Sequence, residues 1–282
     1  MKAQTLLLDS LNARWDTYKA EVKTCRREFS EEVVHDLRVA TRRLLSFLDL
    51  LRSVLQDSSI QKMRRILKSQ LDDLDDLRNM QALLADISET IYENAELKPF
   101  QEYLRQREKK YLRAARKAIK LLRVASLSKR IKKLHQTIEA FKQPDLDASL
   151  FLIVDEAYAI VNQRYALVDL SQPATIHRVR LAFKKFRYMV EVIYPILENF
   201  PADHLKRMHD YQAAMGDIQD MQVALQQLAD FGELAPASYK PEPARSYYEE
   251  RLAIALSCYI EDKGEVITFW RIVPDQPFSQ EK

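Results

Sequence analysis

Two stretches of this sequence repeat one pattern of charged residues, and this internal repeat constrains the fold more than any other feature. VHDLRVATRRLLSFLDL begins at Val34, and IHRVRLAFKKFRYMVEVI begins at Ile176. In each, an arginine follows the first histidine by three residues, and a pair of cations stands four and five residues further on. The matched residues are His35, Arg38, Arg42 and Arg43 in the first copy and His177, Arg180, Lys184 and Lys185 in the second. Because LDDLRNMQALL from Leu74 also matches MGDIQDMQVAL from Met215, the chain is predicted to contain two copies of one folding unit.

The composition predicts that both units are helical. Only three glycines occur among 282 residues, and Leu, Ala, Lys, Arg, Glu and Gln dominate long stretches without the alternation of strands. Pro195 is expected to bend or end its helix. Apolar spacing and breakers predict helices at residues 4–28, 31–56, 59–92, 98–124, 126–142, 147–169, 174–198, 203–231 and 244–270.

The predicted fold is therefore all-α, with two four-helix bundles related by an internal pseudo-twofold repeat. Residues 1–125 form the first half, residues 126–145 a basic connecting helix and linker, and residues 146–282 the second half.

The repeated cations lie beside the predicted core. Like charges at this helical spacing cost several tenths of a kcal/mol per pair on an isolated helix, and a position at the edge of the core raises that cost. In the second copy, Arg187 continues the same face. One explanation is pairing with carboxylates of neighbouring helices. The other is a groove with cations on both walls, for which phosphate is the best-suited anion, because guanidinium groups grip phosphate oxygens in pairs.

The two histidines fall in the first turn of their helices. The positive helix end and the adjacent arginines disfavour a further positive charge, so neutral imidazoles are expected. Each could donate a hydrogen bond to phosphate, and a role in ordering the start of the helix is the alternative.

A third cationic element stands between the copies. Although the net charge is only +3, residues 105–133 contain thirteen Lys and Arg against the single acid Glu108. A solvated face is the usual explanation of such a run, but the near absence of acids favours an anion-binding face. The candidate residues, which follow one side of a helix, are Arg105, Lys109, Arg113, Arg116, Lys117 and Lys120.

Other features limit the functional classes. Cys25 and Cys258 form no CxxC pair, so neither a disulfide framework nor a zinc site is indicated. No apolar run approaches the roughly 18 residues that a membrane span requires, and the N-terminal segment is too short for a signal peptide. We expect a soluble protein of the reducing cytoplasm, without a cofactor and without a membrane partner.

HDLRVATRRLLSFL and IHRVRLAFKKFRYMVEV closely resemble the paired signatures of the CHAD family, the conserved histidine α-helical domain. This resemblance covers almost the whole chain. It implies two related four-helix bundles with a basic pore or groove that binds inorganic polyphosphate, a site that phosphate or sulfate can also occupy. Some members are located at polyphosphate granules, which is one expected location here. Carried over by position, the binding residues are His35, Arg38, Arg42, Arg43, His177, Arg180, Lys184, Lys185 and Arg187.

Two positions depart from the family pattern. Leu45 stands where members often carry an arginine, which the second copy retains as Arg187, so the first wall is expected to bind more weakly there. Asn79 replaces a usual aspartate that the second copy retains as Asp220. An ion pair made by that acid is therefore expected to be missing from the first half.

Two further functions compete with non-catalytic polyphosphate binding. A metal-dependent phosphohydrolase or phosphotransferase could use Asp72, Asp75 and Asp76, which share one side of a helix. These carboxylates are more readily explained by pairing with nearby cations or by exposure to solvent, because no histidine or glutamate completes a ligand set. Nucleic-acid binding through the basic face is the third reading, with nucleic acid expected only as a weak competitor.

Overall fold

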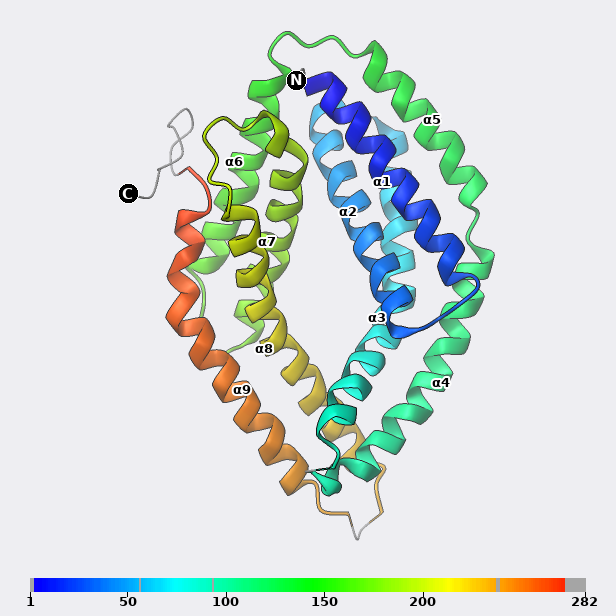
Figure 1. Ribbon diagram of the computed structural model, residues 1–282, viewed down its shortest axis with the longest axis vertical. Helices are drawn as coiled ribbons and strands as arrows, with labels where there is room; N and C mark the ends of the chain where they lie inside the picture. The colour runs from blue at the N-terminus through cyan, green and yellow to red at the C-terminus, as the bar shows by residue number, and fades with distance from the viewer. Residues whose placement is uncertain (1–2, 56, 93, 237–238, 272–282) are drawn as a thin grey trace.

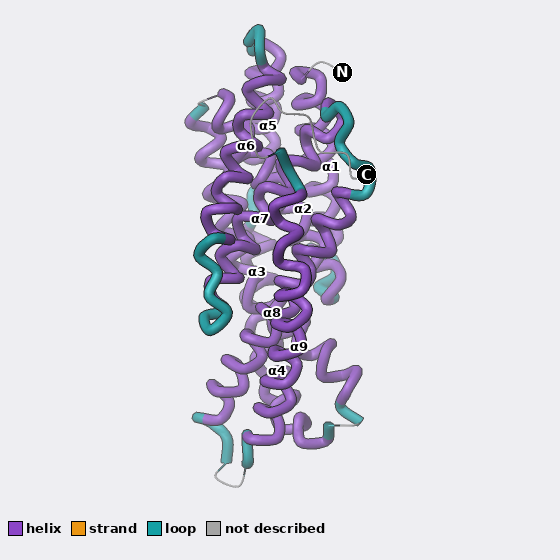
Figure 2. Tube along the Cα trace, turned by 90° about the vertical axis from the view of Figure 1, so that its left-hand side faces the viewer, coloured by secondary structure: helices purple, strands orange, loops and turns teal. Residues whose placement is uncertain are grey.

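The computed structural model of the protein describes residues 3–55, 57–92, 94–236 and 239–271, and within these ranges it contains helices and no strand (Figures 1 and 2). This confirms the predicted all-α class. The α-helices are α1 (Ala3–Cys25), α2 (Glu31–Leu55), α3 (Ser58–Thr90), α4 (Lys98–Leu121), α5 (Val124–Ala140), α6 (Leu146–Tyr165), α7 (Ala174–Ile193), α8 (His204–Gly232) and α9 (Glu242–Asp262). Short 3₁₀ helices are η1 (Ala95–Leu97), η2 (Tyr194–Ile196) and η3 (Lys263–Thr268).

Local sequence explains where the helices begin and end. The Asp57 carboxylate accepts a hydrogen bond of 2.6 Å from the Ser59 amide and so caps the start of α3. Pro195 has the predicted effect, because α7 stops at Ile193, earlier than the expected residue 198, and the chain continues as η2. The last α-helix also ends before its expected limit, at Asp262, and η3 follows it.

The helices pack mainly against their neighbours in sequence. In the first half α1 packs on α2, α2 on α3 and α3 on α4, while α5 lies against α1 and α3. In the second half α6 packs on α7, α7 on α8 and α8 on α9. Figure 1 shows α1–α5 on one side of the molecule and α6–α9 on the other. Between the halves, α2 contacts α7 and α3 contacts α8, so the helices that carry the repeated motifs meet each other.

Two hydrophobic cores hold the described helices together, and each draws on both halves. The larger core includes Leu44 and Leu48 of α2 together with Phe183 and Phe186 of α7, all fully buried. The second core lies at the narrow end in Figure 1, where α3 and α4 meet α8 and α9. Since neither core belongs to one half, the division into two bundles related by a pseudo-twofold axis stays a prediction.

No described helix combines the length and apolar character needed to span a bilayer.

Candidate anion-binding site

Five cations gather where α2 meets α7, and we call them the α2–α7 cluster. They are Arg38 and Arg42 of α2 and Arg180, Lys184 and Arg187 of α7. The apolar stripes of both helices are buried in the larger core, so the adjacent helical faces are held at the seam between the halves. The repeat thus brings together, from opposite halves, the cations that the sequence predicted to line one groove.

Lys184 lies at the centre of this cluster. Burial lowers the pKa of its amine to about 6, and the positive charges of Arg42, Arg180, Arg38 and Arg187 act in the same direction. Among the residues that the structure describes, no carboxylate forms an ion pair with Lys184. The surrounding positive charges therefore favour the binding of an anion beside this amine.

The two arginines of α2 share a carboxylate from α3. Arg38 is only 6% exposed, and its Nη1 forms an ion pair with the Asp75 carboxylate. The Nη2 atom of Arg42 lies 3.6 Å from the same Asp75 oxygen. Burial and then the charge of Arg42 lower the pKa of Arg38 to about 10. For Asp75, the structure confirms the expectation of pairing with nearby cations.

Arg180, the counterpart of Arg38 in the repeat, has a different environment. Its guanidinium lies against Gly216 of α8, where an added Cβ would be 3.5 Å from Nη2 and 3.7 Å from Nε. Its buried Nε has no hydrogen-bond partner among the described residues. Burial lowers the pKa of Arg180, whereas Asp220 and Asp217 act in the opposite direction without forming an ion pair with it.

At the end of the cluster furthest along α7, the charge of Arg187 is compensated by Glu191. Its Nη1 donates to Glu191 over 2.7 Å and its Nε donates to Gln212 over 3.0 Å. Arg43 reaches the other oxygen of Glu191 at 3.7 Å. Lys185 is half-buried. Arg180 and Lys184 are therefore the members of the cluster that form no ion pair with a described carboxylate.

Both motif histidines have a lowered pKa, which is the direction that the expectation of neutral imidazoles requires. For His177 the causes are burial and then Arg180. For His35 they are partial burial and then Arg78, with Arg38 and Lys184 contributing. These effects place both rings within the electrostatic influence of the cluster.

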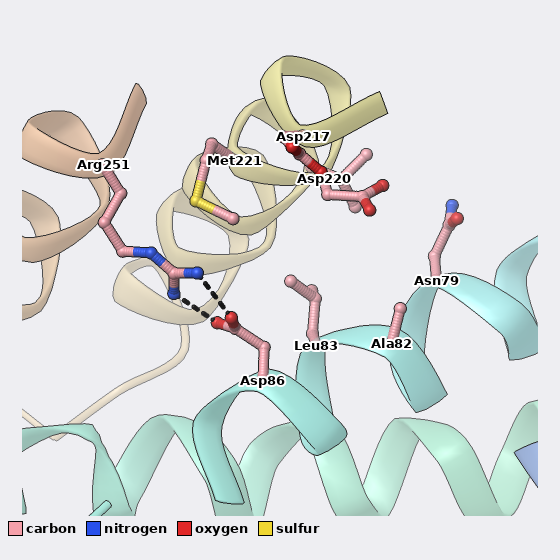
Figure 3. A pocket seen from close by; sticks show the side chains of 9 residues that line it. Asn79, Ala82, Leu83, Asp86, Asp217, Asp220, Met221 and Arg251 are labelled. Atoms are coloured by element: carbon pink, nitrogen blue, oxygen red, sulfur yellow. Dashed lines mark hydrogen bonds and ion pairs between the residues drawn. The ribbon is translucent and has the colours of Figure 1, made fainter. Parts of the chain in front are cut away.

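A cavity of about 150 Å³ adjoins the seam between α3 and α8 (Figure 3). Asn79 and Asp220, which occupy equivalent positions in the repeat, both line it. On its far side, Arg251 of α9 holds Asp86 of α3 through contacts of 2.7 and 2.8 Å. Partial desolvation at the cavity raises the pKa of Asp220, which is still an exposed residue, and Arg180 and Arg78 oppose this shift.

Asn79 stands where an aspartate was expected, and an ion pair made by that acid was predicted to be missing from the first half. Asn79 makes no ion pair, because its amide side chain is uncharged. However, the first half does contain an ion pair between α2 and α3, made by Asp75. Asp220 forms none with a residue that the structure describes.

The cations of α4 lie apart from the α2–α7 cluster. This helix packs mainly on α3 and lies along the outer edge of the first half in Figure 1. Among its six candidates, Arg105 pairs with Glu102 at 3.8 Å and Arg116 stacks on the ring of Phe29 at 5.5 Å. All six are exposed: Arg105, Lys109, Arg113, Arg116, Lys117 and Lys120. The structure therefore separates a shared seam from a solvated basic face.

The described residues contain no group of three His, Cys, Asp or Glu placed to hold a metal ion. Asp72 and Asp76 are exposed.

Sequence reasoning missed several members of the site. Arg78 of α3 influences Arg38, Arg42 and His35, but its counterpart in the repeat is Gln219, so no repeated signal marked it. Glu191 lies inside the stretch that begins at Ile176, and its counterpart Asp49 is also acidic, but the interpretation followed only the repeated cations. These residues became apparent only when the rotation of each helix about its axis was known.

A family model described as CHAD domain matches residues 9–229 of the chain. The structure is similar to the crystal structure of the CHAD domain from the plant Ricinus communis, with a TM-score of 0.69, 18% identity, and coverage of 94% of this chain and 89% of that one. It is also similar to PptA from Streptomyces chartreusis, with a TM-score of 0.65, 17% identity, and coverage of 93% and 99%. No curated protein matches the chain. At these identities the two structures support the fold.

Proposed function

The chain belongs to the CHAD domain family, and from this premise we propose that it binds inorganic polyphosphate at the α2–α7 cluster without catalysing a reaction. The observation that carries the proposal is the position of Lys184, flanked by four arginines and unpaired with any described carboxylate. A chain of phosphate groups supplies several negative charges at close spacing. It can therefore compensate neighbouring cations that a single carboxylate cannot reach.

Polyphosphate suits this cluster better than a nucleic acid does. It has a dense backbone charge and no bases, so its affinity arises from phosphate contacts and counterion release. We therefore expect the arginines and the lysine of the α2–α7 cluster to supply most of the binding free energy. The affinity for polyphosphate should fall steeply as the salt concentration rises.

The test is titration with long-chain polyphosphate by isothermal calorimetry at several salt concentrations. Neutralising four cations of the α2–α7 cluster together, with Arg38→Gln, Arg42→Gln, Arg180→Gln and Lys184→Gln, should abolish most of the binding. It should also reduce the slope of log K against log salt by roughly 0.7 per lost contact. The matched control neutralises four exposed cations of the connecting segment, namely Lys129, Lys132, Lys133 and Lys142.

Equal losses in the two variants would show that net charge, and not the cluster, governs binding. A wild-type protein that fails to bind at submillimolar concentration in low salt would overturn the proposal itself.

The absence of catalysis is part of the same proposal. It is supported by the pairing of Asp75 with Arg38 and Arg42. Asp75 is one of the three carboxylates that a metal-dependent phosphohydrolase was predicted to use, and in this structure it binds arginines. Incubation with polyphosphate and Mg²⁺ or Mn²⁺ should release no orthophosphate above a protein-free control. Attachment to polyphosphate granules would follow from binding and stays a prediction.

The exposed cations of α4 favour weak binding of nucleic acid as a secondary activity. Duplex DNA should displace polyphosphate poorly when the two are compared at equal phosphate concentration. Complete displacement under those conditions would favour the nucleic-acid reading.

A further inference from the structure

Equivalent positions of the repeat hold Asp75 in the first half and Gly216 in the second, and this difference makes the two walls of the cluster unequal. The two residues follow from the alignment of LDDLRNMQALL with MGDIQDMQVAL. Each lies beside the equivalent arginine of its own half, Asp75 beside Arg38 and Gly216 beside Arg180. The repeat therefore allows a comparison, within one protein, of an arginine that is ion-paired at this position with one that is not.

In the first half, Asp75 occupies a place that suits a phosphate oxygen. It contacts the guanidinium groups of both Arg38 and Arg42, and its side chain remains 45% exposed. A carboxylate that is held by two arginines and open to solvent can be displaced by a competing anion, because its exposed edge regains hydration on leaving.

In the second half, Gly216 contributes no side chain at the position equivalent to Asp75. The guanidinium of Arg180 lies at van der Waals distance from the position that a Cβ of residue 216 would take. Its Nε has no hydrogen-bond partner among the described residues, and Lys184, one turn further along α7, has no paired carboxylate there. Asp217 and Asp220 of α8 act on Arg180 from a greater distance.

We propose that Asp75 is an internal counter-anion that closes the Arg38 and Arg42 wall, so that a polyphosphate chain first binds at Arg180 and Lys184 and displaces Asp75 to engage α2. This inference rests on the proposed function and assigns unequal roles to the two halves. Arg180 and Lys184 form the open subsite, and Arg38 and Arg42 form the closed one.

Two opposite substitutions test this inequality. Asp75→Asn removes the competing charge, so affinity for long-chain polyphosphate at low salt should rise by about fivefold or more, because the ligand no longer has to displace a carboxylate from Arg38 and Arg42. Gly216→Asp places a carboxylate against Arg180 and should weaken binding by a similar factor, because the ligand then has to displace that carboxylate.

Each variant has a control that isolates charge. Asp76→Asn makes the same change in net charge at an exposed neighbour of Asp75, and should leave affinity within about twofold. Gly216→Asn matches the size of aspartate without its charge, so the difference between the two variants at position 216 measures the carboxylate alone.

The exchange variant, Asp75→Gly with Gly216→Asp, provides the strictest test because it should reverse the walls. In the wild type, Arg180→Gln should reduce affinity more than Arg38→Gln does. In the exchange variant, this order should invert. Since Asp75→Asn leaves the buried Arg38 without its partner, circular dichroism checks its fold, and Gly216→Asp tests the same inference without touching that pair.

The possible failures can be told apart. If the wild type binds polyphosphate and Asp75→Asn weakens binding, Asp75 orders Arg38 for the ligand. If Asp75→Asn leaves binding unchanged, Asp75 has no effect on it. Either result would contradict this inference but not the proposed function. If neither the wild type nor Asp75→Asn binds, the proposed function falls with it.

Discussion

At the scale of single residues, Lys184 is the group whose chemistry should change most on binding. Burial and four arginines lower its pKa to about 6, so the amine is largely uncharged at pH 7 in the unbound protein. A phosphate group beside it would favour the ammonium form and raise the pKa again. Binding is then coupled to the uptake of a proton.

This coupling predicts that affinity for polyphosphate falls as the pH rises above about 6, where the unbound amine loses its proton. Calorimetry in two buffers with different heats of protonation should reveal proton uptake at pH 7 to 8. Lys184→Arg keeps the charge at all these pH values, so it should flatten the pH dependence and lose that uptake. Because His35 and His177 also have a lowered pKa, their contribution is the uptake that persists in this variant. Equal uptake by the wild type and Lys184→Arg would show that the lysine is not involved.

For Arg38 and Arg180, the sequence predicted the position of each residue but not whether it is ion-paired. The spacing of Arg38 and Arg180 placed both beside the core, and the structure confirms their position near the seam. Whether each is paired was not predictable, because this depends on Asp75 and Gly216 of other helices. A different rotation of α3 or α8 about its own axis would replace those partners, and a single sequence does not specify that rotation.

At the scale of elements, the breakers and apolar spacing predicted every α-helix of the described chain, because proline and polar turns interrupt helices by local chemistry. The position of α4 was harder to predict. Its charge spacing predicts an anion-binding face, and the packing of α4 on α3 leaves that face exposed and outside the α2–α7 cluster.

The separation of α4 from the cluster predicts a dependence on ligand length. Neutralising Arg113, Arg116, Lys117 and Lys120 as glutamine should leave the affinity for tripolyphosphate within about twofold, because these exposed charges lie outside the cluster and are screened by salt. Affinity for long chains, which can extend over α4, should fall several-fold. Calorimetry with both ligands measures the difference, and a marked loss for tripolyphosphate would place α4 in the primary site.

At the scale of the whole molecule, the two halves share their cores instead of each enclosing its own. Phe100 of α4 packs against Phe231 of α8 with ring centroids 6.0 Å apart, and Arg251 of α9 holds Asp86 of α3. These contacts join the halves at the narrow end, while the larger core joins α2 to α7. The seam that carries the cations is therefore supported from both ends.

Shared cores predict that the protein unfolds as one cooperative unit. Differential scanning calorimetry should show a single transition, with the calorimetric enthalpy equal to the van't Hoff enthalpy. Removing the cross-half contact with Arg251→Met should lower the midpoint without splitting the transition. Two resolved transitions would indicate that the halves fold independently, as the division at residues 126–145 implies.

The most direct test of the account is a crystal structure of the protein with tripolyphosphate. We expect phosphate oxygens within hydrogen-bond distance of Arg180 and Lys184 at the seam between α2 and α7. A ligand bound along the exposed face of α4, with the seam unaltered, would contradict the central claim.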